Sequence, residues 1–245
     1  MLTERFKKEI LTYVEDILGS DAKGLFIYKD AIEGNCDPLD DTIYTNIDTL
    51  DSLYYDDITC YCGASKFVIE YRGYVIKIPF TGYWDYDEYD DNSVYLCGYW
   101  TEQNPCETEI ELYEEASEKL KKILLPTIWI GNLNNCVPIY VQKKIDYDYE
   151  AYCAFNTRFK VALDNTSVPM KIIKKIRKIG FGRFSGIREY AIYNIIERFG
   201  IGAAARLLKE LGDFNDLHSG NYGFINDDLV IFDYAGYDRF SWSNI

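Results

Sequence analysis

The feature that most constrains the fold is a pair of apolar, β-branched runs that are separated by only two residues. KFVIEY and YVIKIPF flank Arg72-Gly73, and this spacing is typical of a β-hairpin with a tight turn. The hairpin predicts an antiparallel sheet at this point of the chain. It also puts Lys77 inside an apolar strand, where an unpaired ammonium group is costly to bury, so Lys77 needs an acidic partner.

The expected partner lies in the next periodic segment. ETEIELYEEASEKLKKIL predicts a single helix whose apolar stripe consists of Ile110, Tyr113, Ala116 and Leu120. Glu109 shares the face of this stripe that should pack against the sheet, and Glu107 and Glu111 are the alternatives. The alternative interpretation is purely structural: Lys77 lies at the edge of the sheet and extends its ammonium group into water, and the acidic residues of the helix face solvent.

The remaining pattern predicts an α+β fold with a small antiparallel β lobe that precedes a helical lobe. A helix is expected over 3–18 with Gly19 as its stop signal, and TIWIGNL and CVPIYVQKKI predict two more strands. The segment 81–106 reads as irregular. Three glycine-terminated helices follow from about 165, and NYGFI and LVIFDY predict a last hairpin. The expected domains are an N-terminal helix with an acidic extension (1–57), the β lobe (58–144) and the helical lobe (145–245).

Charge and cysteine content narrow the class of protein. A net charge of −14 over 245 residues argues against general nucleic-acid binding, although 171–188 is basic. The stretches 33–57 and 83–115 are acidic and tyrosine-rich, which suggests a basic protein partner. No apolar run is long enough to span a bilayer, and the N-terminus is charged, so we expect a cytoplasmic protein. The seven irregularly spaced cysteines are expected to be reduced, and a zinc site at Cys60-x-Cys62 lacks further ligands.

Oxygen-bearing side chains gather near the C-terminus. Asp216 and Asn221 bracket DLHSGN, and Asp233 follows 12 residues after Asn221 at the end of the run LVIFD. A hairpin would return Asp233 beside Asn221, and these two oxygen ligands suit Mg²⁺. Asp216 would then act as a base or position a hydroxyl group. The structural interpretation of the same loop is an Asx-type turn.

In chain order, these motifs resemble the protein-kinase-like superfamily. The resemblance covers about residues 58–236: a glycine-containing hairpin, Val-Ile-Lys, a helix with Glu, two strands, helices, Asp-(x)4-Asn, a strand and Asp. DLHSGN is similar to the catalytic loop of aminoglycoside-phosphotransferase-style enzymes and of kinase-like proteins of bacteria and their phages. The resemblance implies a two-lobed kinase-like fold with a truncated helical C-lobe, and it implies ATP and Mg²⁺ as cofactors.

The resemblance also implies a role for each matching residue. Lys77 would hold the α/β-phosphates, Glu109 would hold Lys77, and Asp216 would face the acceptor hydroxyl. Asn221 and Asp233 would bind Mg²⁺. The other nucleotide contacts would be Gly63, Ser65, Val68, Val75, and Val141 and Lys143 in the linker 140–144, whose backbone would bond the adenine edge. Gly63 is a single glycine where the family often has three, and Asn215 replaces the usual arginine before the catalytic Asp.

The leading functional hypothesis is therefore a phosphotransferase that acts on a protein or small-molecule hydroxyl, or transfers AMP in a variant nucleotide geometry. The alternative is a catalytically weak or inactive kinase-like binding protein. Such a protein could be a phage-type inhibitor that uses its acidic, tyrosine-rich surface against a host nucleic-acid-binding or defence protein. A third option is contact with nucleic acid through 171–188.

Overall fold

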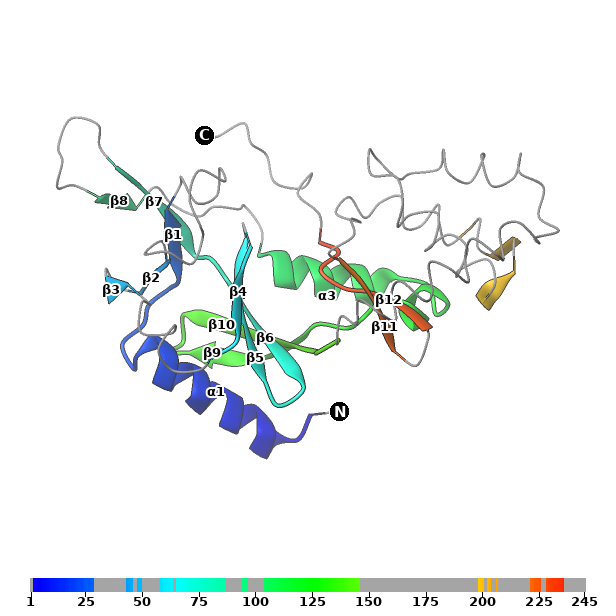
Figure 1. The fold of residues 1–245 in the computed structure, drawn as a ribbon, viewed down its shortest axis with the longest axis horizontal. Coiled ribbons are helices and arrows are strands. Elements are labelled where there is room, and N and C mark those ends of the chain that lie inside the picture. The colour runs from blue at the N-terminus through cyan, green and yellow to red at the C-terminus, as the bar shows by residue number, and fades with distance from the viewer. Residues whose placement is uncertain are drawn as a thin grey trace. The chain divides into compact units, whose positions relative to one another are not determined.

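The computed structural model describes residues 2–28, 43–45, 48–49, 58–63, 65–86, 94–96, 104–145, 198–200, 202–203, 206, 221–225 and 228–235. These residues form a mixed α+β chain (Figure 1) that divides into two compact units. The described residues within Met1–Ile110 and Thr127–Lys144 belong to the first unit. Those within Glu111–Pro126 and Ile145–Arg239 belong to the second, and each unit is described by itself below.

The chain begins with the predicted amphipathic helix, α1 (Glu4–Leu18). The Thr3 side chain caps its start by accepting a hydrogen bond from the Phe6 N–H at 3.2 Å. Gly19 ends it at φ 89°, a conformation that glycine adopts without steric cost, and the Gly19 N–H donates to the Glu15 carbonyl. The sequence prediction for this helix and its stop signal is confirmed.

The centre of the first unit is an antiparallel five-stranded sheet in the order β4-β5-β6-β10-β9. Its strands are β4 (Cys60–Cys62), β5 (Lys66–Tyr71), β6 (Tyr74–Pro79), β9 (Ile128–Leu133) and β10 (Val137–Lys143). The predicted hairpin is confirmed: Arg72 and Gly73 both have positive φ, 48° and 79°, as a tight two-residue turn requires. The connection between β9 and β10 is a three-residue turn, Asn134 to Cys136, in which Asn134 and Asn135 have φ 51° and 60° and the Cys136 N–H donates to the Leu133 carbonyl at 3.1 Å.

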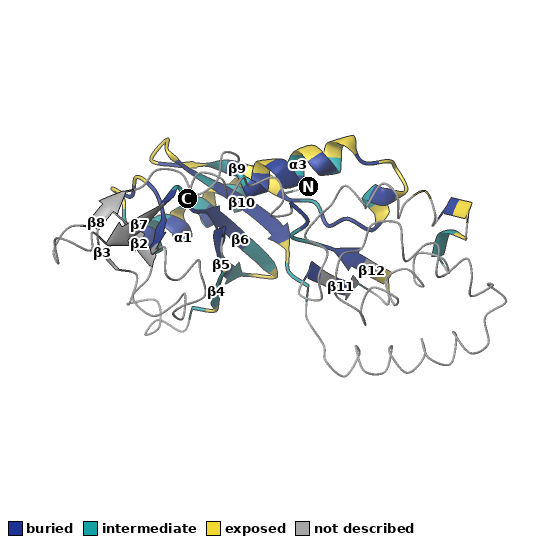
Figure 2. Cartoon of the chain, turned by 90° about the horizontal axis from the view of Figure 1, so that it is seen from above, coloured by how far each residue is buried: buried dark blue, intermediate teal, exposed yellow. Residues whose placement is uncertain are grey.

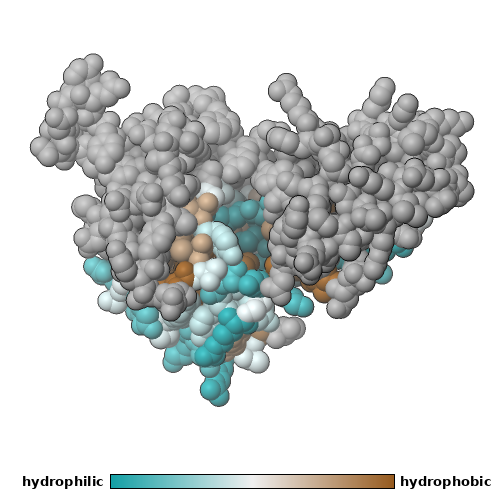
Figure 3. Space-filling model, viewed as in Figure 1, coloured by the Kyte–Doolittle hydropathy of each residue, from teal (hydrophilic) through white to brown (hydrophobic). Residues whose placement is uncertain are grey.

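One face of this sheet forms the hydrophobic core with α1. Strand alternation sends Phe67, Ile69, Ile76, Ile78, Ile139 and Val141 to this face, where they join Ile10, Val14 and Leu18 of the helix. The helix lies against the sheet beside β9 in Figure 1, and β6 and β10 are mostly buried in Figure 2. The surface around α1 in Figure 3 is mainly hydrophilic, as expected for a helix that buries only one stripe.

The opposite face of the sheet carries polar side chains and packs against helix α3 (Pro105–Glu115). We call it the α3-side face. By the strand register, Val68 lies opposite Lys77 and Lys77 opposite Tyr140, while Glu70 lies opposite Val75 and Val75 opposite Gln142. Lys66 lies opposite Pro79 at the end of the hairpin. The side chains at these positions define the candidate site.

A second sheet of the first unit has the order β3-β2-β1-β7-β8. It consists of β1 (Phe26–Tyr28), β2 (Ile43–Thr45), β3 (Asp48–Thr49), β7 (Gly82–Tyr86) and β8 (Val94–Leu96). The prediction that 81–106 is irregular is therefore wrong for 82–86 and 94–96. These strands exist because β7 pairs in parallel with β1, more than 50 residues earlier in the chain, and local periodicity carries no signal of such a partner.

The helix predicted over 107–124 is shorter in the structure. It ends at Glu115, and the Ser117 hydroxyl accepts a hydrogen bond from the Leu120 N–H at 3.2 Å, which starts the separate 3₁₀ turn η2 (Leu120–Lys122). A serine that bonds the backbone in this way competes with a continuous helix. The segment after η2 pairs with the second unit's hairpin, since the Leu125 N–H donates to the Ile231 carbonyl at 2.8 Å.

That hairpin, β11 (Tyr222–Ile225) and β12 (Asp228–Ile231), confirms the strands predicted near the C-terminus. Most of the helical region predicted from 165 lies outside the described residues, as do the basic stretch 171–188 and Asp216. Residues 198–199, 202–203 and 206 are helical, and Gly200 has φ 75°. Among the described helices, none is sufficiently long and apolar to cross a bilayer.

Candidate functional site

The α3-side face is built around Lys77 in β6. Its side chain is 4% exposed, and the two flanking strands bring Val68 and Tyr140 directly opposite it. Lys77 Nζ lies 2.8 Å from Glu109 Oε2 and 3.1 Å from Glu109 Oε1, and the glutamate is fully buried. Lys77 therefore meets Glu109 as the sequence predicts. Of the alternatives, Glu107 bonds Tyr140 instead, and Glu111 is exposed.

Two further side chains orient the carboxylate. The Thr127 hydroxyl donates a short hydrogen bond to Glu109 Oε2 and accepts one from Gln142 Nε2 at 3.0 Å. Thr127 is 5% exposed and Gln142 is 2% exposed, so these hydrogen bonds are shielded from solvent. A buried carboxylate needs hydrogen-bond donors for its lone pairs. Thr127 supplies one to Glu109, and Gln142 holds the Thr127 hydroxyl in position.

A second lysine contacts the same carboxylate. Lys66 begins β5, its side chain is 7% exposed, and its Nζ lies 3.4 Å from Glu109 Oε1. Glu109 is thus approached by Lys66, Lys77 and Thr127 from three different strands or strand ends. The sequence prediction contained only the contact with Lys77.

Tyr140 fixes the first turn of α3 to the sheet. Its hydroxyl donates to Glu107 Oε1 at 3.1 Å and accepts from Asn104 Nδ2 at 2.8 Å, and Asn104 Oδ1 in turn accepts from the Cys106 N–H. Burial, together with the nearby charge of Glu107, raises the pKa of Tyr140 far above its usual value. The phenol is therefore neutral and holds the helix that carries Glu109.

Val68, opposite Lys77, and Val75, opposite Glu70, are diagonal neighbours on this face, and a second ionic group lies beside them. Both valines are half-buried. Glu70 accepts hydrogen bonds from Lys144 Nζ at 2.6 Å and from the Tyr61 hydroxyl at 2.8 Å. Burial alone would raise the pKa of Glu70, but the hydrogen bonds from Lys144 and Tyr61 outweigh it and lower the pKa. This arrangement gives an apolar strip of two valines between two sets of charges.

The remaining expected nucleotide contacts occupy different positions. Gly63 and Ser65 lie between β4 and β5; the Gly63 N–H donates to the Lys66 carbonyl at 3.0 Å, and the Ser65 carbonyl accepts from the Phe80 N–H at 3.1 Å. Val141 points into the core on the α1 side, away from Lys77. In the sheet it is paired with Ile76 of β6 on one side and with Ile128 of β9 on the other. Lys143 is exposed at the end of β10.

The second unit holds the two expected metal ligands side by side. Asn221 precedes β11 and is 4% exposed, and its Nδ2 donates to the Asp233 backbone carbonyl at 2.8 Å. The Phe232 N–H donates to the Asn221 carbonyl at 3.0 Å, which closes the hairpin between them. Asp233 has φ 53°, a conformation that is uncommon outside glycine and often occurs at functional positions.

These two residues fit Mg²⁺ in donor type, since carboxylate and amide oxygens are the ligands that a hard cation prefers. In the part of the chain that the structure describes, no three His, Cys, Asp or Glu side chains converge as a metal-binding group. Mg²⁺ does not need such a group, because it commonly binds one or two protein oxygens together with substrate phosphates and water. The third residue expected here, Asp216, lies outside the described residues.

The cysteines contribute no further cluster among the described residues. Cys60, Cys62, Cys106 and Cys136 are reduced thiols, and burial raises the pKa of Cys60. A raised pKa leaves less thiolate, which is the form that binds metals and reacts.

Sequence reasoning missed Lys66, Thr127 and Gln142. A usable signal exists for Lys66: the two-residue turn at Arg72-Gly73 fixes the hairpin register, and counting back from it puts Lys66 on the same face as Lys77. No comparable signal exists for Thr127 and Gln142, because their contacts depend on where α3 packs.

Comparison of the whole chain with protein-family models, with curated protein sequences and with solved structures found no match in any of the three.

Proposed function

We propose that the protein is an ATP- and Mg²⁺-dependent phosphotransferase of the protein-kinase-like type, which transfers phosphate to a hydroxyl group of a protein or small molecule. The observation that carries the proposal is the buried ion pair in which Lys77 Nζ lies 2.8 Å from Glu109 Oε2. Burying two charges is expensive, and replacing such a pair by apolar side chains often leaves stability unchanged or improves it. A functional requirement for a fixed cation at this position accounts for that expense.

The surroundings of Lys77 suit a nucleotide. A lysine ammonium acts as a point charge for phosphate oxygens, and its effect is largest where water is excluded. Glu109, held by Thr127, keeps the Lys77 side chain in one orientation. Val68 and Val75 offer a half-buried apolar strip on the same face, which is the surface that an adenine ring requires.

The residues of the second unit would serve the metal and the acceptor. Asn221 and Asp233 would hold Mg²⁺, which neutralises charge on the phosphate oxygens when it is bound. Asp216, which sequence alone assigns, would orient the acceptor hydroxyl and receive its proton. We place this activity in the cytoplasm, where ATP is available and where thiols such as those of the described cysteines stay reduced.

The test is phosphate transfer by the purified chain. Wild type, Lys77→Met and Asp216→Ala are incubated with γ-labelled ATP, Mg²⁺ and a bacterial lysate supplemented with small-molecule hydroxyl acceptors. Labelling should fall by about 100-fold or more in both variants, because each loses a group that stabilises or positions the reacting atoms. Lys8→Met, which removes an exposed lysine of α1, is the matched control and should label like wild type.

Four outcomes separate the alternatives. Label transferred from α-labelled ATP but not from γ-labelled ATP would indicate AMP transfer. If wild type, Lys77→Met and Asp216→Ala label alike, the catalytic proposal is wrong. Stabilisation by Mg²⁺ and ATP without transfer would identify a kinase-like nucleotide-binding protein. If neither stabilisation nor transfer occurs, the best remaining function is that of a binding protein with acidic, tyrosine-rich stretches.

A further inference from the structure

The Thr127 hydroxyl is hydrogen-bonded on both sides. It donates to Glu109 Oε2 and accepts from Gln142 Nε2 at 3.0 Å. A hydroxyl group has one proton and an amide N–H can only donate, so the bond from Gln142 leaves the Thr127 proton for Glu109. The amide at one end and the carboxylate at the other therefore fix the direction of both bonds. We call these two bonds, from Gln142 to Thr127 and from Thr127 to Glu109, the donor relay.

The sheet fixes the positions of both residues that donate in the relay. Val141 lies opposite Ile128 in the β9–β10 register, and continuing this register by one residue puts Gln142 opposite Thr127. On its other side Gln142 lies opposite Val75 of β6. The backbone of neighbouring strands, and not a surface loop, thus carries the donor relay.

The other donors to Glu109 are long side chains. Lys77 Nζ lies 2.8 Å from Oε2 and 3.1 Å from Oε1, and Lys66 Nζ lies 3.4 Å from Oε1. A lysine ammonium ends a flexible four-carbon stem, and the terminal torsion of a glutamate is broad, so lysines alone orient the plane of a carboxylate only loosely. Threonine is short and branched at Cβ, which makes its side chain stiff. Thr127 is therefore the donor that fixes the Glu109 carboxylate, and the carboxylate in turn orients Lys77.

We propose that Thr127 and Gln142 are positioning residues for the phosphate-binding cation, and that the donor relay sets the affinity of Lys77 for the phosphates of ATP. Both residues act through Glu109, so neither has to contact the nucleotide. An ammonium group that is already oriented before the phosphates arrive has less freedom to lose on binding. The inference rests on the proposed function for the role of Lys77, but it concerns binding and not transfer.

The experiment is a calorimetric titration of wild type and Thr127→Val with ATP in the presence of Mg²⁺. Valine keeps the branched shape of threonine, and Glu109 keeps its contacts with Lys66 and Lys77, so the variant should fold, as its thermal unfolding would verify. Its dissociation constant for ATP should rise about 10-fold, because Glu109 loses one charge-assisted hydrogen bond. Thr127→Ser retains the hydroxyl and should restore most of the affinity. Gln142→Met leaves Thr127 in place and should raise the dissociation constant about 3-fold.

Thr108→Val is the matched control. Thr108 is also a buried threonine, and its hydroxyl donates to the Asn104 carbonyl at 3.3 Å, so the control loses a hydrogen bond that does not involve Glu109. Its ATP affinity should stay within about 2-fold of wild type. A double-mutant cycle tests whether Thr127 acts through Lys77. In the Lys77→Met background, titrated at higher ATP concentration, Thr127→Val should change the affinity by less than about 2-fold.

Rescue and coupling distinguish positioning from a merely structural role. An equal loss of ATP affinity in Thr127→Val and Thr108→Val would overturn the inference, as would a loss that Thr127→Ser does not restore or that persists in the Lys77→Met background. A rescued, Lys77-dependent loss without phosphate transfer by wild type would sustain it while the proposed function failed. Transfer by wild type with unchanged ATP affinity in Thr127→Val would do the reverse. Absence of ATP binding to wild type would contradict both.

Discussion

The polar side chains of the α3-side face act in two groups that meet on α3. One group, Lys66, Lys77 and Thr127, converges on Glu109. The other holds the start of the helix through Tyr140, Asn104 and Glu107. Because Tyr140 lies directly opposite Lys77 in the sheet register, the same pair of strands positions both the lysine and the helix that carries its partner. Tyr140 is a positioning residue in this arrangement.

Replacement of Tyr140 by Phe should have a pH-dependent effect on stability. At neutral pH the change removes two partly buried hydrogen bonds and should lower the free energy of unfolding by about 1–2 kcal/mol. The pKa of Tyr140 is raised in the folded protein by burial and by Glu107, so folding favours the neutral phenol. The stabilisation is complete below the unfolded-state pKa of about 10, and above it decreases by about 1.4 kcal/mol per pH unit. The difference between wild type and Tyr140→Phe should therefore shrink above about pH 10.

Urea denaturation of both proteins between about pH 7 and pH 11 measures this difference. Tyr61→Phe is the matched control, because the Tyr61 hydroxyl also donates to a glutamate, Glu70 at 2.8 Å, but the residue is 53% exposed. Its substitution should cost less than about 1 kcal/mol. A stability difference for Tyr140→Phe that stays constant across the alkaline range would contradict the argument.

Part of this site follows from sequence and part does not. Lys77 and Glu109 could be paired in advance, because an apolar strand around a lysine demands a carboxylate and helical spacing favours Glu109 over Glu107 and Glu111. Lys66 follows from the hairpin register, once that register is applied to both strands. Thr127 and Tyr140 could not be assigned, since a threonine before a strand and a tyrosine within one have no preferred partner until the helix is packed.

At the scale of elements, short-range sequence signals were sufficient to predict a helix or strand wherever a turn or cap residue fixes the backbone. α1 and the hairpins around Arg72-Gly73 and Asn134-Asn135 follow from glycine, asparagine and capping residues in sequence. β1 and β7 could not be found in this way, because their parallel pairing joins Phe26 to Gly82 and neither strand alternates clearly. α3 was overextended because the apolar stripe continues past Ser117, whose hydroxyl bonds the backbone of the next turn.

The packing of α1 on the sheet predicts that a core substitution in this helix lowers the stability of the protein without lowering its affinity for ligand. Ile10 is fully buried between α1 and the sheet, on the face opposite Lys77. Ile10→Ala leaves a cavity and should lower the free energy of unfolding by about 2–4 kcal/mol in urea denaturation, although Ala is the better helix former. The affinity for Mg²⁺ and ATP at a temperature where the variant is folded should change by less than about 2-fold, since no residue of the α3-side face is altered.

Lys8→Ala, an exposed change on the same helix, should stay within about 0.5 kcal/mol of wild type. An Ile10→Ala variant as stable as wild type would show that α1 contributes little to the core. A variant that is folded but binds ATP much more weakly would show that the two faces of the sheet are coupled.

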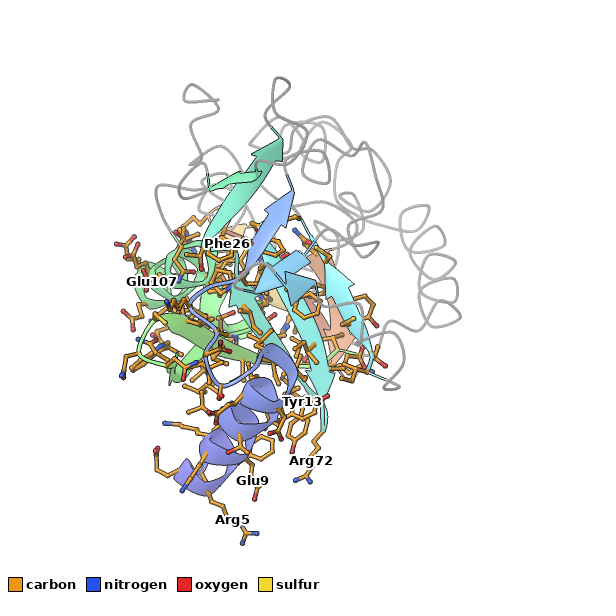
Figure 4. The ribbon with its side chains drawn as sticks, turned by 90° about the vertical axis from the view of Figure 1, so that its left-hand side faces the viewer. Arg5, Glu9, Tyr13, Phe26, Arg72 and Glu107 are labelled. Atoms are coloured by element: carbon orange, nitrogen blue, oxygen red, sulfur yellow. The ribbon has the colours of Figure 1, made fainter. Side chains whose placement is uncertain are left out.

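At the scale of the whole molecule, the dominant property is the net charge of −14. Like charges over one chain repel each other and favour expansion, and this repulsion is long-ranged. The ion pairs at the surface each contribute little to stability, because water and salt screen them. They include Lys7–Glu4 at 2.7 Å and the pairs that Arg5 and Arg72 make with Glu9, whose residues are labelled in Figure 4. The buried Lys77–Glu109 pair is screened by salt much less than these.

Raising the NaCl concentration from about 0.01 M to about 0.15 M should therefore raise the melting temperature. The Debye length falls from about 30 Å to about 8 Å over this range, which removes long-range repulsion before it removes contacts within an ion pair. A gain of about 1 kcal/mol would appear as a rise of about 2–4 °C in differential scanning calorimetry. Glu111→Lys/Glu114→Lys, two exposed changes that make the net charge less negative, should show a smaller rise. A melting temperature that falls with salt in wild type would mean that local ion pairs outweigh the general repulsion of the acidic chain.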